Sequence, residues 1–127
     1  MSKLPKGLRV LLVEDNPQVR DFAEGLLADL GCEVVTAHCA EDALDRLAED
    51  GIDLILSDVV MPGMSGVELA QKVQEDYPTV PILLATGYSD EIVKRGSEFS
   101  VLLKPFGAAD LSKAMAAILN GSRDAAA

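Results

Sequence analysis

Three carboxylates, a hydroxyl and a lysine each stand directly after an apolar run of the sequence. Glu14 and Asp15 follow LRVLLV, Asp58 follows IDLILS, Thr86 follows VPILLA, and Lys104 follows FSVLL. Clustered carboxylates repel one another, so a cation or protons must hold them together. Oxygen ligands without a histidine or a thiolate favour a hard ion such as Mg²⁺. A carboxylate can attack a phosphoryl group and form an aspartyl phosphate. The set therefore fits phosphoryl transfer, in which positioning and charge neutralisation supply most of the catalysis.

The elements that must position these residues are strands alternating with helices. Alternating apolar runs and helical periodicity indicate an α/β fold with a parallel sheet. We expect strands over Leu8–Val13, Glu33–Thr36, Ile52–Ser57, Val80–Ala85 and Phe99–Leu103. We expect helices from Asn16-Pro17 to Gly31, over Ala40–Glu49, from the capping box Ser65-Gly66-Val67-Glu68 to a point before Pro78, over a very short Ser89–Arg95, and over Ala108–Leu119.

The connections restrict the topology of this sheet. Right-handed crossovers leave few possibilities, and we expect a flavodoxin-like, doubly wound sheet of five parallel strands in the order 2-1-3-4-5. Ligands of such sheets bind beyond the carboxyl ends of the strands, near the switch between strands 1 and 3. The five polar residues stand at those ends.

Each of the five residues also has an ordinary structural role. Glu14 and Asp15 precede a helix, whose dipole stabilises negative charge. Asp58 fits the start of a turn, while Thr86 and Lys104 fit the solvated ends of strands. Considered one at a time, Thr86 and Lys104 fit an ordinary structural role better than a role in a site. For Asp58, the structural role and the role in a site fit equally well. Their joint placement at four strand ends favours a common site.

Length and charge exclude several classes of protein. The chain has 127 residues, which fits one domain, and we expect residues 1–120 to form it and residues 121–127 to be a disordered tail. The net charge of −10 opposes binding to nucleic-acid phosphates. No run approaches the roughly 18 apolar residues of a membrane helix, and the segment MSKLPKGLRV has no apolar run long enough for a signal peptide. We expect a cytoplasmic domain, in which Cys32 and Cys39 form neither a disulfide nor a metal site and His38 has a surface role.

The motifs LLVEDNPQVR, SDVVMPGMSG, ATGY and LLKPF together resemble a response-regulator receiver of two-component signalling, including those attached to hybrid histidine kinases. The resemblance implies that Asp58 accepts a phosphoryl group from a histidine kinase or a histidine phosphotransfer protein. It implies that Asp15 and Asp58 ligate Mg²⁺ together with the backbone carbonyl of Val60. Glu14 would act through water or by positioning.

The same resemblance assigns the remaining site residues. Thr86 is the switch hydroxyl, and Lys104 pairs with the phosphoryl group and precedes Pro105 in a cis peptide bond. The family often has an aromatic residue where this chain has Val101, and we hypothesise that Tyr88 partly replaces it or gates water. An exposed aromatic without such a role is an equal alternative for Tyr88.

The resemblance also bears on partners. It implies a receiver rather than a conventional enzyme, acting through contact with a protein and without a DNA-binding output in this chain. We expect a monomer or a weak homodimer formed through helix 4, strand 5 and helix 5. The short span before Lys104 predicts a truncated fourth helix.

Three other functions compete with this interpretation. A haloacid-dehalogenase-like phosphatase would need a second aspartate two residues after Asp58, where this chain has Val60. A flavin binder would need a Ser/Thr/Gly-rich loop after the first strand, where Glu14 and Asp15 would repel the phosphate. A scaffold that is never phosphorylated would have no use for the complete acceptor set.

Overall fold

A computed structural model describes residues 4–49, 51–87 and 99–120. Its elements in chain order are β1 (Arg9–Val13), α1 (Pro17–Asp29), β2 (Glu33–Ala37), α2 (Ala40–Glu49), β3 (Leu54–Asp58), α3 (Gly66–Asp76), β4 (Ile82–Thr86), β5 (Ser100–Leu103) and α5 (Ala108–Leu119). The expected fourth helix, Ser89–Arg95, lies outside the described residues, as do Tyr88 and the expected tail, 121–127.

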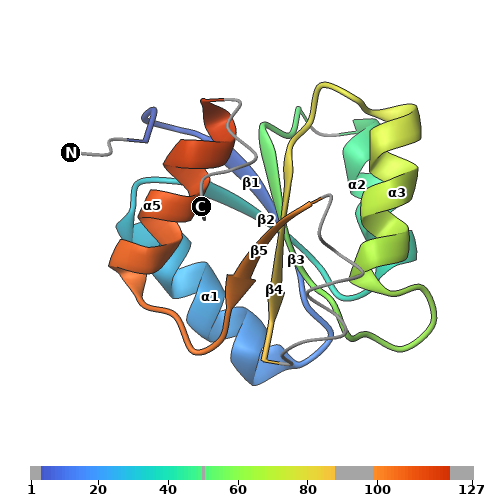
Figure 1. Ribbon diagram of the computed structural model, residues 1–127, viewed down its shortest axis with the longest axis horizontal. Helices are drawn as coiled ribbons and strands as arrows, with labels where there is room; N and C mark the ends of the chain where they lie inside the picture. Colours follow the sequence, from blue (N-terminus) through green and yellow to red (C-terminus); the bar gives the residue numbers. More distant parts are fainter. Residues whose placement is uncertain (1–3, 50, 88–98, 121–127) are drawn as a thin grey trace.

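The five strands form one parallel sheet in the order β2-β1-β3-β4-β5, which confirms the expected topology. Helices α1 and α5 cover one face of the sheet, and α2 and α3 cover the other (Figure 1). The register pairs Asp58 with Ala85 and Thr86 with Leu103. The carboxyl ends of the strands therefore meet at one edge, as the order requires.

Two strands begin and end later than their apolar runs suggest. β3 begins at Leu54 because the carboxylate of Asp53 accepts a hydrogen bond from the backbone amide of Arg9 at 2.9 Å, replacing a regular strand contact. β4 begins at Ile82 because Pro81 has no amide hydrogen to donate. Both strands run one residue further than expected, so Asp58 and Thr86 lie within the sheet and are held by its hydrogen bonds.

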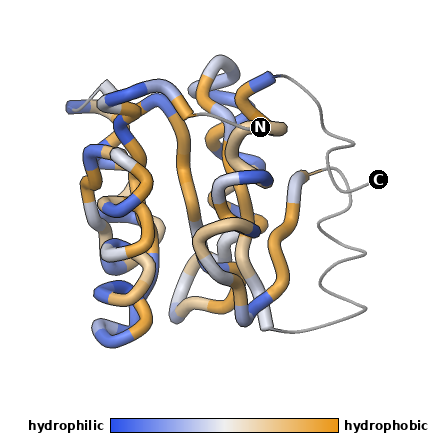
Figure 2. Tube along the Cα trace, turned by 90° about the vertical axis from the view of Figure 1, so that its left-hand side faces the viewer, coloured by the Kyte–Doolittle hydropathy of each residue, from blue (hydrophilic) through white to orange (hydrophobic). Residues whose placement is uncertain are grey.

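The core consists of two apolar layers, one on each face of the sheet. Strand β1 shows the alternation: Val10 and Leu12 pack toward α1 and α5, whereas Leu11 and Val13 pack toward α2 and α3. Figure 2 shows the apolar strands between helices that are hydrophilic on their outer faces. A strand covered on both faces reads as a continuous apolar run, which is why the sequence signal was strong.

The helix starts follow the expected caps. The side chain of Asn16 accepts hydrogen bonds from the amides of Gln18 and Val19 at 2.9 and 3.1 Å, at the start of α1. Ser65 and Glu68 form the predicted capping box of α3. These caps fix where each helix leaves the edge that carries the polar residues.

Gly25 and Gly31 offer a matched test of backbone conformation. An added Cβ meets no atom within 4 Å at either position, but Gly25 lies inside α1 and Gly31 has a φ of +87°. Gly25→Ala should stabilise the domain by about 1 kcal/mol, because alanine restricts the unfolded chain and suits a helix. Gly31→Ala should destabilise it by about 1 kcal/mol, because its φ is unfavourable for a residue with a Cβ. Urea unfolding of both variants measures the two effects, and equal signs would contradict this account.

Candidate functional site

An acidic cluster lies at the carboxyl edge of the sheet. Glu14 follows β1, Asp15 comes next, and Asp58 ends β3. One carboxylate oxygen from each of the three residues lies within 4.8 Å of the others. The structure therefore brings together the three carboxylates that the sequence places at strand ends.

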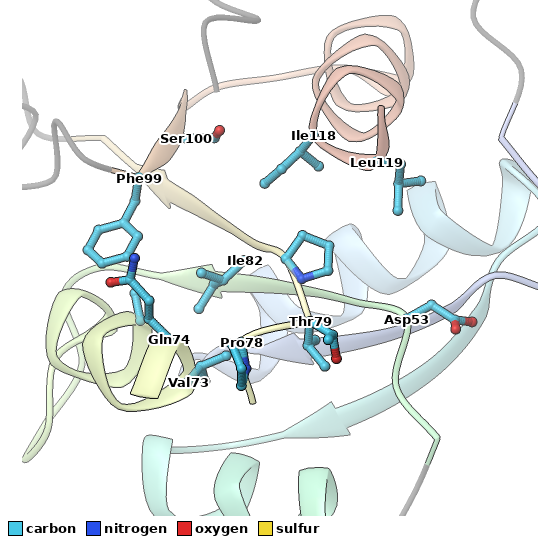
Figure 3. A pocket seen from close by; sticks show the side chains of 13 residues that line it. Asp53, Val73, Gln74, Pro78, Thr79, Ile82, Phe99, Ser100, Ile118 and Leu119 are labelled. Carbon is cyan, nitrogen blue, oxygen red and sulfur yellow. The ribbon is translucent and has the colours of Figure 1, made fainter. Parts of the chain in front are cut away.

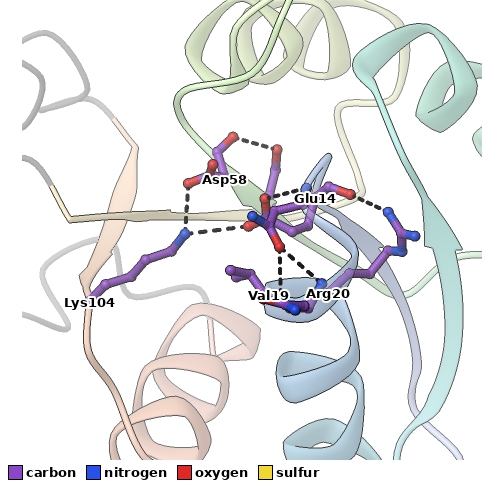
Figure 4. A network of polar contacts seen from close by, with 8 residues as sticks. Glu14, Val19, Arg20, Asp58 and Lys104 are labelled. Carbon is purple, nitrogen blue, oxygen red and sulfur yellow. Dashed lines mark hydrogen bonds and ion pairs between the residues drawn. The ribbon is translucent and has the colours of Figure 1, made fainter.

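Lys104 joins two of these carboxylates. Its Nζ lies 3.1 Å from Oδ1 of Asp58 and 3.3 Å from Oε1 of Glu14 (Figure 4). The side chains of Glu14 and Asp58 are 6% and 13% exposed, so solvent screens these ion pairs only partly. Lys104 follows β5, and its peptide bond to Pro105 is cis, as the resemblance implied.

Glu14 is held on every side. Its amide donates to the carbonyl of Ala37 at 3.0 Å, and its Oε2 accepts from the amide of Asn16 at 3.1 Å. Nη1 of Arg20 donates to its carbonyl oxygen at 2.9 Å. Together with Lys104, these contacts leave the carboxylate of Glu14 buried and fixed. Arg20 was not among the residues that the sequence pointed to.

The backbone of Asp58 is held as closely as the side chain of Glu14. The amide of Val59 donates to the carbonyl of Ala85 at 3.1 Å, and the buried hydroxyl of Ser57 donates to the carbonyl of Asp58 at 2.9 Å. The first residue of α3, Gly66, lies directly against the Asp58 carbonyl and donates its amide to the carbonyl of Val59 at 2.8 Å. The Asp58 carboxylate is therefore presented by a backbone with little freedom.

Burial and mutual repulsion make these carboxylates harder to ionise. Burial raises the pKa of Glu14, and the charge of Asp58 adds to the increase against the opposing Asn16 amide and Lys104. Burial also raises the pKa of Asp58, against the opposing hydrogen bond and charge of Lys104. Burial by itself would lower the pKa of Lys104, but the two carboxylates outweigh it and raise that pKa. Burial is thus the largest cause of the raised carboxyl pKa values, and Lys104 is the group that opposes it at both carboxylates.

The donor set fits a hard divalent cation. Three carboxylates lie together, and they include one exposed residue, Asp15, that faces water. Mg²⁺ prefers oxygen ligands, one or two of them carboxylates, and retains several waters. The cluster, in which all three ligand groups are carboxylates, therefore suits Mg²⁺.

Three further residues singled out from the sequence belong to β4, to the loop after β3 and to β5. Thr86 is 1% exposed at the end of β4, and its carbonyl accepts from the amide of Lys104 at 2.8 Å. Val60 is 46% exposed in the loop after β3. Val101 is half-buried in β5, opposite Leu84, and packs against the core that faces α2 and α3.

The loop methionines, the single histidine and the two cysteines have ordinary structural surroundings. Met61 is buried and Met64 packs against the core. His38 has a side chain that is 70% exposed and pairs with Asp42 at 3.1 Å, near the start of α2. Cys32 and Cys39 are free thiols, and both are partly buried.

A cavity of about 460 Å³ lies at the opposite edge of the sheet (Figure 3). Ile82 and Ser100, the first residues of β4 and β5, help to line it between the ends of α3 and α5. It is therefore separate from the acidic cluster, which lies at the last residues of the strands.

Among the helices of the described residues, none has the length and the apolar character that a membrane span requires.

Comparison with known proteins places the chain among signalling domains. The family model for the response regulator receiver domain matches residues 10–116. The response regulator receiver protein CpdR of Brucella abortus is 36% identical over 107 residues, which cover 81% of this chain and 89% of CpdR. The response regulator protein FleR of Pseudomonas aeruginosa is 39% identical over 105 residues, which cover 79% of this chain and only 22% of FleR.

Solved structures agree with this assignment. The response regulator protein TrrA of Thermotoga maritima, solved in complex with Mg²⁺-BeF, shares 29% identity and superposes with a TM-score of 0.77, covering 84% of this chain and 95% of TrrA. The match to the family model spans most of the sequence and includes every residue of the acidic cluster and Lys104. The chain belongs to the response regulator receiver domain family of two-component signal transduction.

Proposed function

We propose that this domain accepts a phosphoryl group on Asp58 from a phosphohistidine of a histidine kinase or a histidine phosphotransfer protein. One observation carries the proposal: the Asp58 carboxylate ends β3 within the acidic cluster, with Nζ of Lys104 only 3.1 Å from its Oδ1. That arrangement combines a nucleophile with a cation that can neutralise charge on a transferred group.

The transfer requires few changes of bonding. A carboxylate oxygen of Asp58 attacks phosphorus, a P–O bond forms, and the P–N bond to the donor imidazole breaks. The imidazole leaves with the electron pair of that bond and takes up a proton from water. Lys104 already lies beside Asp58, so it can pair with the phosphoryl oxygens without a large movement. The hydroxyl of Thr86, at the end of the neighbouring strand, would donate to one of them.

The domain would work with Mg²⁺. Asp15 and Asp58 would ligate the ion with the backbone carbonyl of Val60, and Glu14 would act through water or by positioning. A bound Mg²⁺ would neutralise the carboxylates and charge on the phosphoryl oxygens. The similarity to TrrA, whose structure holds Mg²⁺-BeF, supports this choice of ion.

Phosphorylation would act on partners by shifting a conformational equilibrium. Two states exist before modification, and the phosphoryl group stabilises the one that can contact it. Thr86 is suited to this role because its carbonyl is bonded to the amide of Lys104, which links the ends of β4 and β5. We propose residues 1–120 as the receiver unit, with its output through contact with another protein. The phosphatase alternative lacks support, since Val60 provides no second acid.

Intact-mass measurement after incubation with a small phosphoryl donor and Mg²⁺ tests the proposal. Wild type should gain one phosphoryl group, whereas Asp58→Asn should gain none because an amide is not a nucleophile toward phosphorus. Asp53→Asn is the matched control, because Asp53 precedes the other end of β3 and an amide oxygen can still accept from Arg9. It should be phosphorylated like wild type. Equal labelling of wild type and Asp58→Asn would refute the assignment.

A further inference from the structure

We propose that Arg20 is a positioning residue for the acidic pair, because its guanidinium fixes the peptide that joins Glu14 to Asp15. Nη1 of Arg20 donates to the carbonyl oxygen of Glu14 at 2.9 Å, and that carbonyl belongs to the peptide unit whose nitrogen is Asp15 (Figure 4). The inference rests on the proposed function, since it concerns the Mg²⁺ site of that proposal.

The location of Arg20 in α1 needs an explanation. It is the fourth residue of a helix that begins at Pro17, within the first turn, which contains no acidic side chain. The helix dipole disfavours a positive charge there. The half-buried guanidinium instead reaches back to the end of β1, where it satisfies a carbonyl beyond the last strand residue. The contact with Glu14 offsets the unfavourable position.

Asp15 depends on this contact more than Glu14 does. Glu14 has side-chain contacts of its own, to Lys104 and the Asn16 amide. The side chain of Asp15 is exposed, so its direction follows from the backbone on either side. On one side the guanidinium of Arg20 holds the Glu14 carbonyl, and on the other the amide of Asn16 donates to Oε2 of Glu14 at 3.1 Å. Arg20 therefore anchors the peptide that precedes Asp15, and the Glu14 carboxylate holds the peptide that follows it.

Positioning and charge predict opposite effects on Mg²⁺ binding. A guanidinium repels Mg²⁺, so loss of its charge alone would tighten binding. Loss of the anchor would let the Asp15 carboxylate move away from Asp58 and Glu14, and would weaken binding. Loss of a residue that orients a metal ligand typically weakens metal affinity by about tenfold or more. The sign of the change therefore separates the two roles.

The experiment is calorimetric titration of the full chain with Mg²⁺, without a phosphoryl donor. Arg20→Met keeps an apolar stem but removes both donor and charge, and its affinity should fall by about tenfold. Arg20→Lys keeps the charge but lacks the planar guanidinium. Its Mg²⁺ affinity should fall by about threefold, and should therefore lie between the affinities of wild type and Arg20→Met. Arg46→Met is the matched control. Arg46 is an exposed residue of α2, and its ion pair with Asp42 is long, with 3.8 Å between Nε and Oδ1. Its affinity should equal that of wild type.

A second readout separates this role from a loss of folding. Urea unfolding establishes that each variant is folded, and phosphorylation of Arg20→Met should recover the wild-type rate when Mg²⁺ is raised to saturation. An affinity of Arg20→Met equal to or tighter than wild type would overturn the positioning role, as would an unaltered affinity of Arg20→Lys if Arg20→Met does not fold. If wild type is not phosphorylated on Asp58 while Arg20→Met loses Mg²⁺ affinity, the proposed function fails and the positioning role stands.

Discussion

Gly66→Ala should destabilise the domain by about 3 kcal/mol, the upper part of the usual range for overpacking, and should slow phosphorylation of Asp58. A Cβ at this position would overlap the Asp58 carbonyl oxygen and lie 2.9 Å from Cα of Val59. Both obstacles are backbone atoms, so no side chain can move aside to make room. Either α3 must move away from β3 or the peptide of Asp58 must rotate, and rotation would displace the nucleophile.

Urea unfolding and the rate of phosphorylation by a small donor measure the two consequences. Gly25→Ala is the control, because the same change at an open helical position should add stability. Addition of saturating Mg²⁺ should not restore the phosphorylation rate of Gly66→Ala, since the displaced group is the acceptor. A Gly66→Ala variant as stable as wild type would show that α3 can adjust without cost, and a wild-type rate would show that Asp58 keeps its position.

The sequence predicted the edge of the sheet where the site lies because each signal there is local. An apolar run is long enough to indicate a buried strand. Asn16 and Ser65 mark the starts of helices through their capping side chains, and Gly31 marks the end of a helix because it has no side chain. Given a parallel sheet in the expected order, the residues after each run must gather at one edge. The approach of Lys104 to Asp58, 46 positions away in the sequence, followed from topology alone.

Contacts that depend on tertiary packing could not be predicted from the sequence. The sequence predicts Gly66 only as part of a capping box. Position 66 requires glycine because the Asp58 carbonyl lies against it, and the local sequence does not predict that contact. The only local signal of a role for Arg20 is its positive charge in the first turn of a helix, where the dipole disfavours it, and its contact with Glu14 depends on how α1 packs beside β1. The starts of β3 and β4 moved because Asp53 and Pro81 alter the hydrogen bonding at the other edge.

Lys104 and a bound cation would both pair with the Asp58 carboxylate and would both lie beside Glu14. Because the folded state raises the pKa of Asp58 and of Glu14, the metal-free folded protein holds protons more tightly than the unfolded chain does. Stability of the metal-free protein from these two groups should therefore fall as pH rises above their ordinary pKa values of 3.8 and 4.5. Lys104 limits this fall, and Mg²⁺ should abolish most of it.

Lys104→Met should consequently have effects of opposite sign on metal binding and on phosphoryl transfer. Mg²⁺ should bind about tenfold more tightly, because the ammonium that repels it and pairs with Asp58 and Glu14 is gone. Phosphorylation at saturating Mg²⁺ should nevertheless slow by about a hundredfold to a thousandfold, the usual loss when one charge-stabilising donor is removed. The fall in metal-free stability with pH should extend to higher pH than in wild type, since both carboxyl pKa values rise further.

Calorimetric titration with Mg²⁺, donor-dependent phosphorylation and urea unfolding across pH measure these three effects. Lys113→Met, an exposed position on α5, is the control and should match wild type in all of them. Weaker Mg²⁺ binding by Lys104→Met would mean that the lysine holds the carboxylates in place rather than competing for them. A wild-type phosphorylation rate would mean that the charge beside Asp58 does not act on the transferred group, because the acceptor and its metal ligands are otherwise unchanged.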